Sequence, residues 1–156
     1  MRFESLSQSP SIEAPALPCL CAQTRRVDRL LNRFYDDALR PLGINTMQKS
    51  LLTTIRRSPE GADFAELSKR LAMDRSTLTR NLSTLENAGL VSVVPHEHDR
   101  RKRVVSLTET GRQTETASIS LWRDAQERVI DALGFERAEE LTTLLASVEQ
   151  TMRELD

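Results

Sequence analysis

Four consecutive cations form the most chemically distinctive stretch of the sequence, Arg100, Arg101, Lys102 and Arg103. A cluster of positive side chains of this density suits an anionic partner. Asp99 directly precedes the run, and a carboxylate aimed at the same anion would repel it. We therefore expect Asp99 to orient a neighbouring arginine through a charge-assisted hydrogen bond. The alternative interpretation is that the stretch is a solvated turn.

A second group of polar side chains surrounds an apolar repeat earlier in the chain. Leu78, Leu82 and Leu85 recur at helical spacing and predict a helix with one apolar face. The polar residues that lie largely off this face are Arg75, Ser76, Thr77, Thr79, Arg80 and Asn81. On a helix that enters the major groove of DNA, Arg80 could contact guanine bidentately or a phosphate, and the hydroxyl residues suit backbone contacts or thymine methyl groups.

The net charge of −1 conceals a division of charge along the chain. Residues 19–107 carry 16 Lys/Arg and 10 Asp/Glu, a net charge of +6, whereas residues 108–156 carry 5 Arg and 11 Asp/Glu, a net charge of −6. This polarity indicates one face that meets an anion and another that does not. The simpler alternative is that the charges only solvate helix surfaces.

Capping residues and turn signals predict the elements that hold the two polar groups. Asp63 is placed to cap a short helix, and after a turn at Ala72–Met73 Asp74 is placed to cap the helix that Gly89 ends. The β-branched runs "VSVVP" and "RVVSL" then predict a hairpin with a wholly polar tip. A helix-turn-helix followed by a basic hairpin predicts DNA binding, with the second helix in the major groove and the hairpin on the neighbouring backbone or minor groove.

Long amphipathic helices flank this unit. One runs from Cys19 to Pro41, a second begins near Asn45 or Thr46 and ends before Pro59, and Thr108 can cap a long helix that Gly134 ends before a final helix. The outer helices carry more apolar surface than one small helix-turn-helix unit needs to cover. The Ser- and Pro-rich residues 1–18 show no lasting periodicity and predict a flexible arm.

The stretch "AELSKRLAMDRSTLTRNLSTLENAGLVSVVPHEHDRRKRVVSLTETGR" resembles the MarR family of winged helix-turn-helix transcriptional regulators. The similarity is strongest in "DRSTLTRNLSTLENAGLV" and in the pattern of Asp99, Arg101, Leu107 and Thr108, and "LRPLGINTMQ" resembles the family's connection between its first two helices. The resemblance covers roughly residues 19–155. It implies a mainly α fold with a small β-hairpin wing, in which residues 46–107 form the winged helix-turn-helix of a single domain, residues 19–156.

The resemblance also implies an obligate homodimer built from residues 19–41 and 109–155, which accounts for the surplus apolar surface. Such a dimer binds a pseudo-palindromic operator in double-stranded DNA, with its recognition helices about one helical turn apart. Members of the family are usually repressors that release DNA when a small phenolic or other ligand, or an oxidant, alters the dimer.

Cys19 and Cys21 are the residues that bear on the signal. The family's organic-hydroperoxide sensors are similar at this point: Cys21 falls on their reactive cysteine and Tyr35 on a tyrosine that helps to activate it. Where the sensors have a second tyrosine, this chain has Arg25, which could lower the thiol pKa electrostatically. The alternatives are packing in the dimer core, or metal capture, for which His96 and His98 would have to join the thiols.

Other functional classes lack the residues they need. We find no Gly-rich phosphate loop, no Ser/His/Asp set and no metal-ligand spacing, so neither an enzyme nor a cofactor is predicted. No apolar run reaches the roughly 18 residues of a membrane span, and two cysteines this close in sequence cannot staple distant parts of a fold, which favours a cytoplasmic protein. Trp122, at core spacing, is predicted to be a packing residue. A winged helix that binds protein instead of DNA is a remote alternative.

Overall fold

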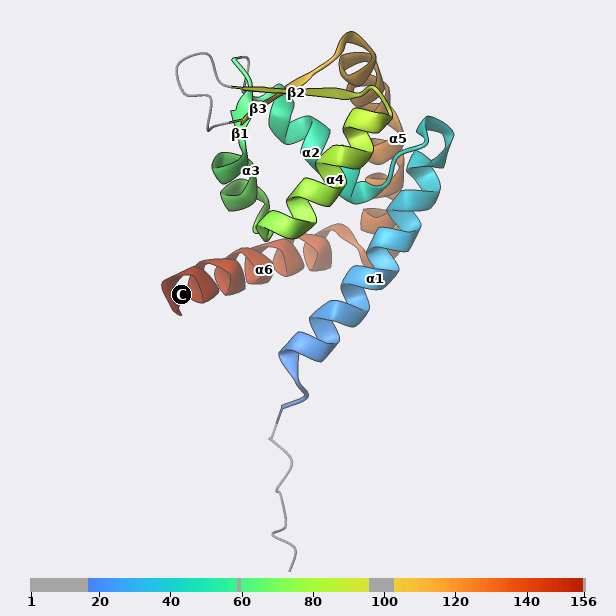
Figure 1. Cartoon of the computed structure of the whole chain (residues 1–156). Helices are drawn as coiled ribbons and strands as arrows, with labels where there is room; N and C mark the ends of the chain where they lie inside the picture. The colour runs from blue at the N-terminus through green and yellow to red at the C-terminus, as the bar shows by residue number, and fades with distance from the viewer. Residues whose placement is uncertain (1–16, 59, 96–102, 156) are drawn as a thin grey trace, which may run out of the picture.

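A computed structural model of the chain describes residues 17–58, 60–95 and 103–155, and its elements are labelled in Figure 1. In chain order they are α1 (Leu20–Leu39), a 3-10 helix η1 (Arg40–Leu42), α2 (Thr46–Arg56), β1 (Ala62–Asp63), α3 (Phe64–Leu71), α4 (Arg75–Asn87), β2 (Val91–Pro95), β3 (Arg103–Leu107), α5 (Glu109–Leu133) and α6 (Phe135–Leu155). The predicted mainly helical fold with a small antiparallel wing is confirmed. The predicted arm, residues 1–18, lies outside the described residues except for Leu17 and Pro18.

The predicted helix starts are confirmed by their hydrogen bonds. Asn45 and Gln48 form a reciprocal capping box at α2, and Asp63 accepts from the Glu66 amide at the start of α3. Asp74 and Thr108 cap α4 and α5 in the same way. Each cap fixes where its helix begins, so α3 and α4 are joined by only a tight turn.

The wing sheet contains one strand that the sequence pattern did not predict. Besides the predicted hairpin of β2 and β3, the two residues of β1 pair antiparallel with β3, giving the order β1-β3-β2. A strand of two residues is too short to show alternation, so its pairing depends on the tertiary fold. The hairpin register runs from Val91 opposite Leu107 to Pro95 opposite Arg103, and the predicted polar tip lies outside the described residues.

The apolar core lies inside the winged helix. Its buried side chains come mainly from α2, α3, α4 and the sheet, and include Leu51, Leu52, Ile55, Leu67, Leu78, Leu82, Leu85 and Val105. The apolar face predicted for α4 is therefore the face that packs inward. Of the polar residues predicted to contact DNA, Thr77 and Asn81 are half-buried, and the exposed ones are Arg75, Ser76, Thr79 and Arg80. The core thus positions α4 with four of its six predicted contact residues exposed.

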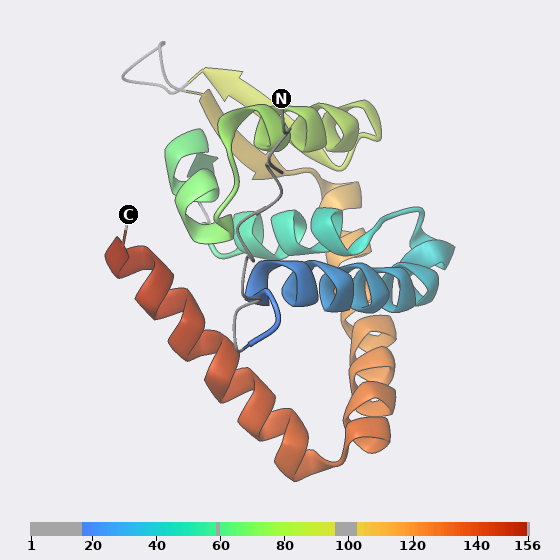
Figure 2. The ribbon, with the colours of Figure 1, turned by 90° about the horizontal axis from the view of Figure 1, so that it is seen from below.

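The helices outside the core leave much apolar surface uncovered. Figure 2 shows α5 and α6 as the two arms of a V, with α6 reaching away from α5. No side chain of α6 is buried, and its exposed large apolar residues are Phe135, Leu141, Leu144, Leu145, Val148, Met152 and Leu155. On α1, Leu20, Val27 and Leu30 are exposed as well. These faces are what the sequence predicts for helices that need more than one small unit to cover them.

Candidate nucleic-acid interface

The N-terminus of α4 is organised by one carboxylate. Asp74 accepts three hydrogen bonds, from the Ser76 hydroxyl to Oδ1 at 2.5 Å, from the Thr77 amide to Oδ1 at 2.9 Å and from the Thr77 hydroxyl to Oδ2 at 2.7 Å. The Ser76 hydroxyl and then the Thr77 donors hold the pKa of Asp74 well below its usual range. Asp74 therefore stays ionised, and the hydroxyl protons of Ser76 and Thr77 point at it.

Two further predicted contact residues of α4 also donate within the protein. The Thr79 hydroxyl donates to the Arg75 carbonyl at 2.7 Å, and the Asn81 amide donates to the Thr77 carbonyl at 2.9 Å. A hydroxyl has a single proton, so while these bonds persist the hydroxyls of Ser76, Thr77 and Thr79 offer a partner only their lone pairs, and the two threonines also carry a methyl group. Such groups accept from base amino groups or pack on thymine methyls, whereas a phosphate would require the internal bonds to break.

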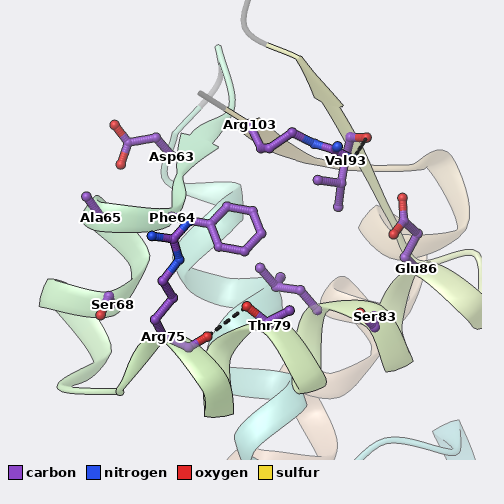
Figure 3. Close-up of a pocket in the computed structure, with 11 residues that line it drawn as sticks. Asp63, Phe64, Ala65, Ser68, Arg75, Thr79, Ser83, Glu86, Val93 and Arg103 are labelled. Atoms are coloured by element: carbon purple, nitrogen blue, oxygen red, sulfur yellow. Dashed lines mark hydrogen bonds between the residues drawn. The ribbon is translucent and has the colours of Figure 1, made fainter. Parts of the chain in front are cut away.

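The two arginines predicted on α4 lie differently. Both are exposed, but Arg75 rises across a groove toward Phe64 of α3, as Figure 3 shows, and lines that groove. Arg80 does not line the groove, and it belongs to the outward face of α4. Of these two exposed arginines, Arg75 borders the cavity and Arg80 does not.

The groove is a cavity of about 590 Å³ between α3, α4 and the sheet. Phe64 lies on its α3 side and Val93 on its sheet side, and two cations and two carboxylates border it: Arg75, Arg103, Asp63 and Glu86. Arg103 lies at the start of β3 and donates to the Val93 carbonyl at 3.2 Å. Sequence patterns missed Phe64 and Glu86, since only the packing of α3 beside α4 brings them to the helix already predicted to contact DNA.

Of the predicted wing residues, the structure describes Arg103. Arg103 is exposed at the base of the hairpin, whereas Asp99, Arg100, Arg101 and Lys102 lie outside the described residues, as do His96 and His98. Within residues 17–58, 60–95 and 103–155, no cluster of three or more His, Cys, Asp or Glu side chains is arranged to hold a metal ion. In the same ranges, no helix is long and apolar enough to cross a membrane.

The predicted redox residues lie at opposite ends of α1. Cys19 is the N-cap residue, Cys21 is in the first turn, and both are exposed. Tyr35 follows Cys21 by 14 residues on the same helix, a rise of roughly 21 Å. Its hydroxyl donates to Gln126 and its ring stacks on Trp122 at 5.5 Å, and burial raises its pKa. Within one chain Tyr35 cannot reach either thiol, so any activating contact has to come from a partner subunit.

A polar network that sequence patterns missed joins the winged helix to α5. Glu115 is only 3% exposed, and its carboxylate accepts from Arg56 at the end of α2. Trp122 lies two turns further along α5, half-buried, with the Lys49 ammonium 4.9 Å from its ring centroid. The available signal was the spacing of Glu115, Ser118, Trp122 and Ala125, which places all four on one helix face.

Comparison with known proteins gives matches over most of the chain. A model of the MarR family matches residues 42–102. The M. tuberculosis transcriptional regulator MosR, solved in complex with DNA, is 34% identical; the match covers 87% of this chain and 99% of that one, with a TM-score of 0.74. A mutant of E. coli MarR complexed with operator DNA is 28% identical, over 83% of this chain and 92% of that one, with a TM-score of 0.75. The S. aureus MepR-DNA complex shares the fold at 18% identity, over 86% and 99% of the two chains, with a TM-score of 0.75.

Proposed function

We propose a mechanism for this chain from the premise that it belongs to the MarR family of winged helix-turn-helix transcriptional regulators. It is a DNA-binding regulator and not an enzyme. In our proposal it acts as a homodimeric repressor on a pseudo-palindromic operator, with α4 of each subunit in the major groove and the wing residues 99–103 on the adjacent backbone or minor groove. The observation that carries the proposal is the outward polar face of α4, held in place by its buried leucines.

The roles of the α4 residues follow from their hydrogen bonds. Arg80 supplies an exposed guanidinium for a guanine edge. Ser76, Thr77 and Thr79 accept from base amino groups or contact thymine methyls, because their protons are donated within the helix end. Arg75 lies toward the groove and contacts the backbone at the edge of the interface. The wing cations then add a sequence-independent electrostatic attraction to phosphates.

Arg80→Ala is expected to lower the preference for operator over random DNA, with a discrimination loss of about 1 to 3 kcal/mol for a bidentate contact to guanine. The measurement is fluorescence anisotropy at fixed salt, with a labelled duplex from the DNA flanking the protein's own gene and a scrambled duplex of equal length. Lys69→Ala is the control, because Lys69 is an exposed cation on α3 outside the proposed contact set. Equal weakening on both duplexes would reassign Arg80 to a phosphate, and unchanged binding would remove it from the interface.

The proposed dimer explains the uncovered apolar faces. Exposed apolar side chains on α1 and α6 would be buried against the same helices of a second subunit, and the acidic C-terminal half would lie away from the DNA. A two-fold dimer places its two recognition helices about one turn of DNA apart, which is why a pseudo-palindromic operator is expected. Analytical ultracentrifugation tests this directly, since a mass near 17.7 kDa at micromolar concentration would contradict it.

We propose that a small phenolic or other ligand releases the repressor from DNA. The groove of about 590 Å³ lies against α4, offers Phe64 to an aromatic ring, and has Arg75 and Arg103 for an acidic group. A bound ligand would occupy space beside the helix that enters the major groove. The second candidate signal is thiol oxidation, which is favoured by the exposure of both Cys19 and Cys21 at the N-terminus of α1.

Salicylate, used as a phenolic acid probe, is expected to raise the Kd for the flanking duplex by about tenfold, a typical coupling between two sites. Arg103→Ala should reduce that effect, because it removes a cation from the groove. The parallel experiment treats the reduced protein with cumene hydroperoxide and then with a thiol reductant. The thiol sensor is favoured if the oxidant abolishes DNA binding by wild type, the reductant restores it, and Cys21→Ser is insensitive to the oxidant. DNA binding that changes with neither salicylate nor cumene hydroperoxide would contradict both signals.

A further inference from the structure

The interface between α2 and α5 is polar along a continuous stripe. Lys49, Thr53 and Arg56 recur at spacings of four and three residues and therefore share one face of α2. Opposite them, Glu115 and Trp122 lie two turns apart on one face of α5. Packing between neighbouring helices is normally apolar, so a polar stripe between α2 and α5 is unusual.

The contacts of the stripe centre on Glu115, whose side chain is 4% exposed. Arg56 Nη1 donates to Glu115 Oε2 and, at 2.8 Å, to the Thr116 hydroxyl. On the other carboxylate oxygen, the Thr53 hydroxyl donates to Oε1 at 3.4 Å, and the Lys49 ammonium in turn donates to Thr53 at 3.4 Å. Both carboxylate oxygens of a buried group are thus satisfied from α2.

Such a network restricts how α2 can lie against α5. Apolar side chains tolerate small rotations and translations of one helix over another, whereas hydrogen bonds to a buried carboxylate lose strength with small changes of distance and angle. The pair is buried on one side only, since the Glu115 side chain is 4% exposed and the Arg56 side chain 48%. Such a pair is weak evidence for stability, because desolvation of the buried carboxylate offsets the attraction, and its best supported use is to select one arrangement. The stripe therefore selects one position of α2 on α5.

That position is transmitted to the recognition helix through the core. Leu51, Leu52 and Ile55 occupy the buried face of α2 and belong to the same apolar cluster as Leu78 and Leu82 of α4. α2 and α4 are consequently parts of one packed body. In a dimer held together by α1, α5 and α6, the placement of α2 on α5 determines where each α4 lies relative to the two-fold axis.

We propose that the Glu115–Arg56 pair is a positioning contact that sets the spacing between the operator half-sites the dimer accepts. The inference rests on the proposed function, since it requires a dimer that binds two half-sites. One added base pair moves a half-site by about 3.4 Å and rotates it by about 35° around the DNA axis. A dimer with a fixed angle between α2 and α5 cannot place both recognition helices on half-sites with the added base pair. A dimer in which that angle can vary is able to do so.

The experiment selects bound DNA from a pool of duplexes with a random 30-base-pair centre and compares the half-site spacings in the sequences recovered. Wild type is expected to enrich one spacing. Glu115→Gln removes the charge but keeps the shape, and Arg56→Lys keeps the charge but loses the guanidinium that joins Glu115 to Thr116. Both variants are expected to enrich at least two spacings. The affinities of a variant for its two best spacings should differ by less than about threefold, whereas those of wild type should differ by about tenfold.

The matched control is Glu109→Gln, which breaks the exposed pair of Glu109 and Arg112 on the same helix and should leave the single spacing unchanged. Lower stability alone would reduce the amount of DNA recovered without widening the distribution of spacings. Circular dichroism checks that each variant is folded. The proposal is overturned if a folded variant selects the wild-type spacing alone, or if neither variant folds. If wild type enriches no two-fold motif, the proposed function fails first and the inference falls with it.

Discussion

Gly111→Ala should lower the free energy of unfolding by about 3 kcal/mol, at the upper end of what added atoms cost in a packed region. In the interior of a helix the same change normally raises stability by about 1 kcal/mol. The sign is reversed here because a Cβ on Gly111 would lie 1.9 Å from the Leu90 carbonyl oxygen. The Leu90 carbonyl cannot easily shift away from an added Cβ, because its oxygen accepts a hydrogen bond from the Thr108 amide at 3.1 Å and Leu90 is buried.

The measurement is urea unfolding followed by circular dichroism, at a fixed protein concentration because a dimer's stability depends on it. Gln113→Ala is the control, since Gln113 is exposed on the same helix and its replacement should change stability by less than about 0.5 kcal/mol. A Gly111→Ala protein at least as stable as wild type would show that α5 does not dock on Leu90 as closely as described. The result would then also weaken the placement of the wing on α5.

The double replacement Leu144→Glu with Val148→Glu should raise the Kd for the flanking duplex by about 100-fold or more, because binding two linked half-sites gives that much avidity over one. Both side chains are more than half exposed in the single chain, at 57% and 52%, so glutamate there disturbs no packing within the subunit. In the proposed dimer the same positions are buried against a partner, where four added carboxylates cannot be solvated. The expected species in solution is a monomer with intact helices.

Sedimentation velocity and anisotropy on the same samples check the two parts of this result. Thr143→Glu with Gln150→Glu is the matched control, because it adds the same charge to the opposite face of α6. The control should remain dimeric and bind DNA as wild type does. A charged double variant that stays dimeric would place the subunit contact away from this face of α6, and a monomer that binds DNA with unchanged affinity would contradict the two-half-site model.

The parts of the fold that were predictable are those decided by neighbours in sequence. Asp63, Asp74 and Thr108 each accept a hydrogen bond from an amide three residues later, so the start of each helix is a local event. Gly89 and Gly134 adopt positive φ angles after α4 and α5, as their positions at the ends of apolar repeats suggest. Such signals locate the helices and the hairpin without knowledge of what packs on them.

The parts that escaped prediction depend on contacts between distant segments. Strand β1 exists only because Ala62 and Asp63 meet β3, and Glu115 accepts from Arg56 only because α2 lies against α5. In the candidate interface, too, the residue types were predictable from the sequence and the side-chain geometry was not. The identities of Ser76 and Thr77 were predicted, but the direction of their hydroxyl protons follows from the side-chain geometry at Asp74, which a residue pattern does not encode.

Trp122 gives the molecule a built-in optical reporter. It is the single tryptophan of the sequence, so intrinsic indole emission arises from one position. Its ring stacks on Tyr35 of α1 and lies beneath the Lys49 ammonium of α2, while its own backbone belongs to α5. The wavelength and intensity of that emission depend on the polarity and charge around the ring. Emission at a single wavelength therefore follows the junction of three helices in real time, without a label and while the protein is on its DNA.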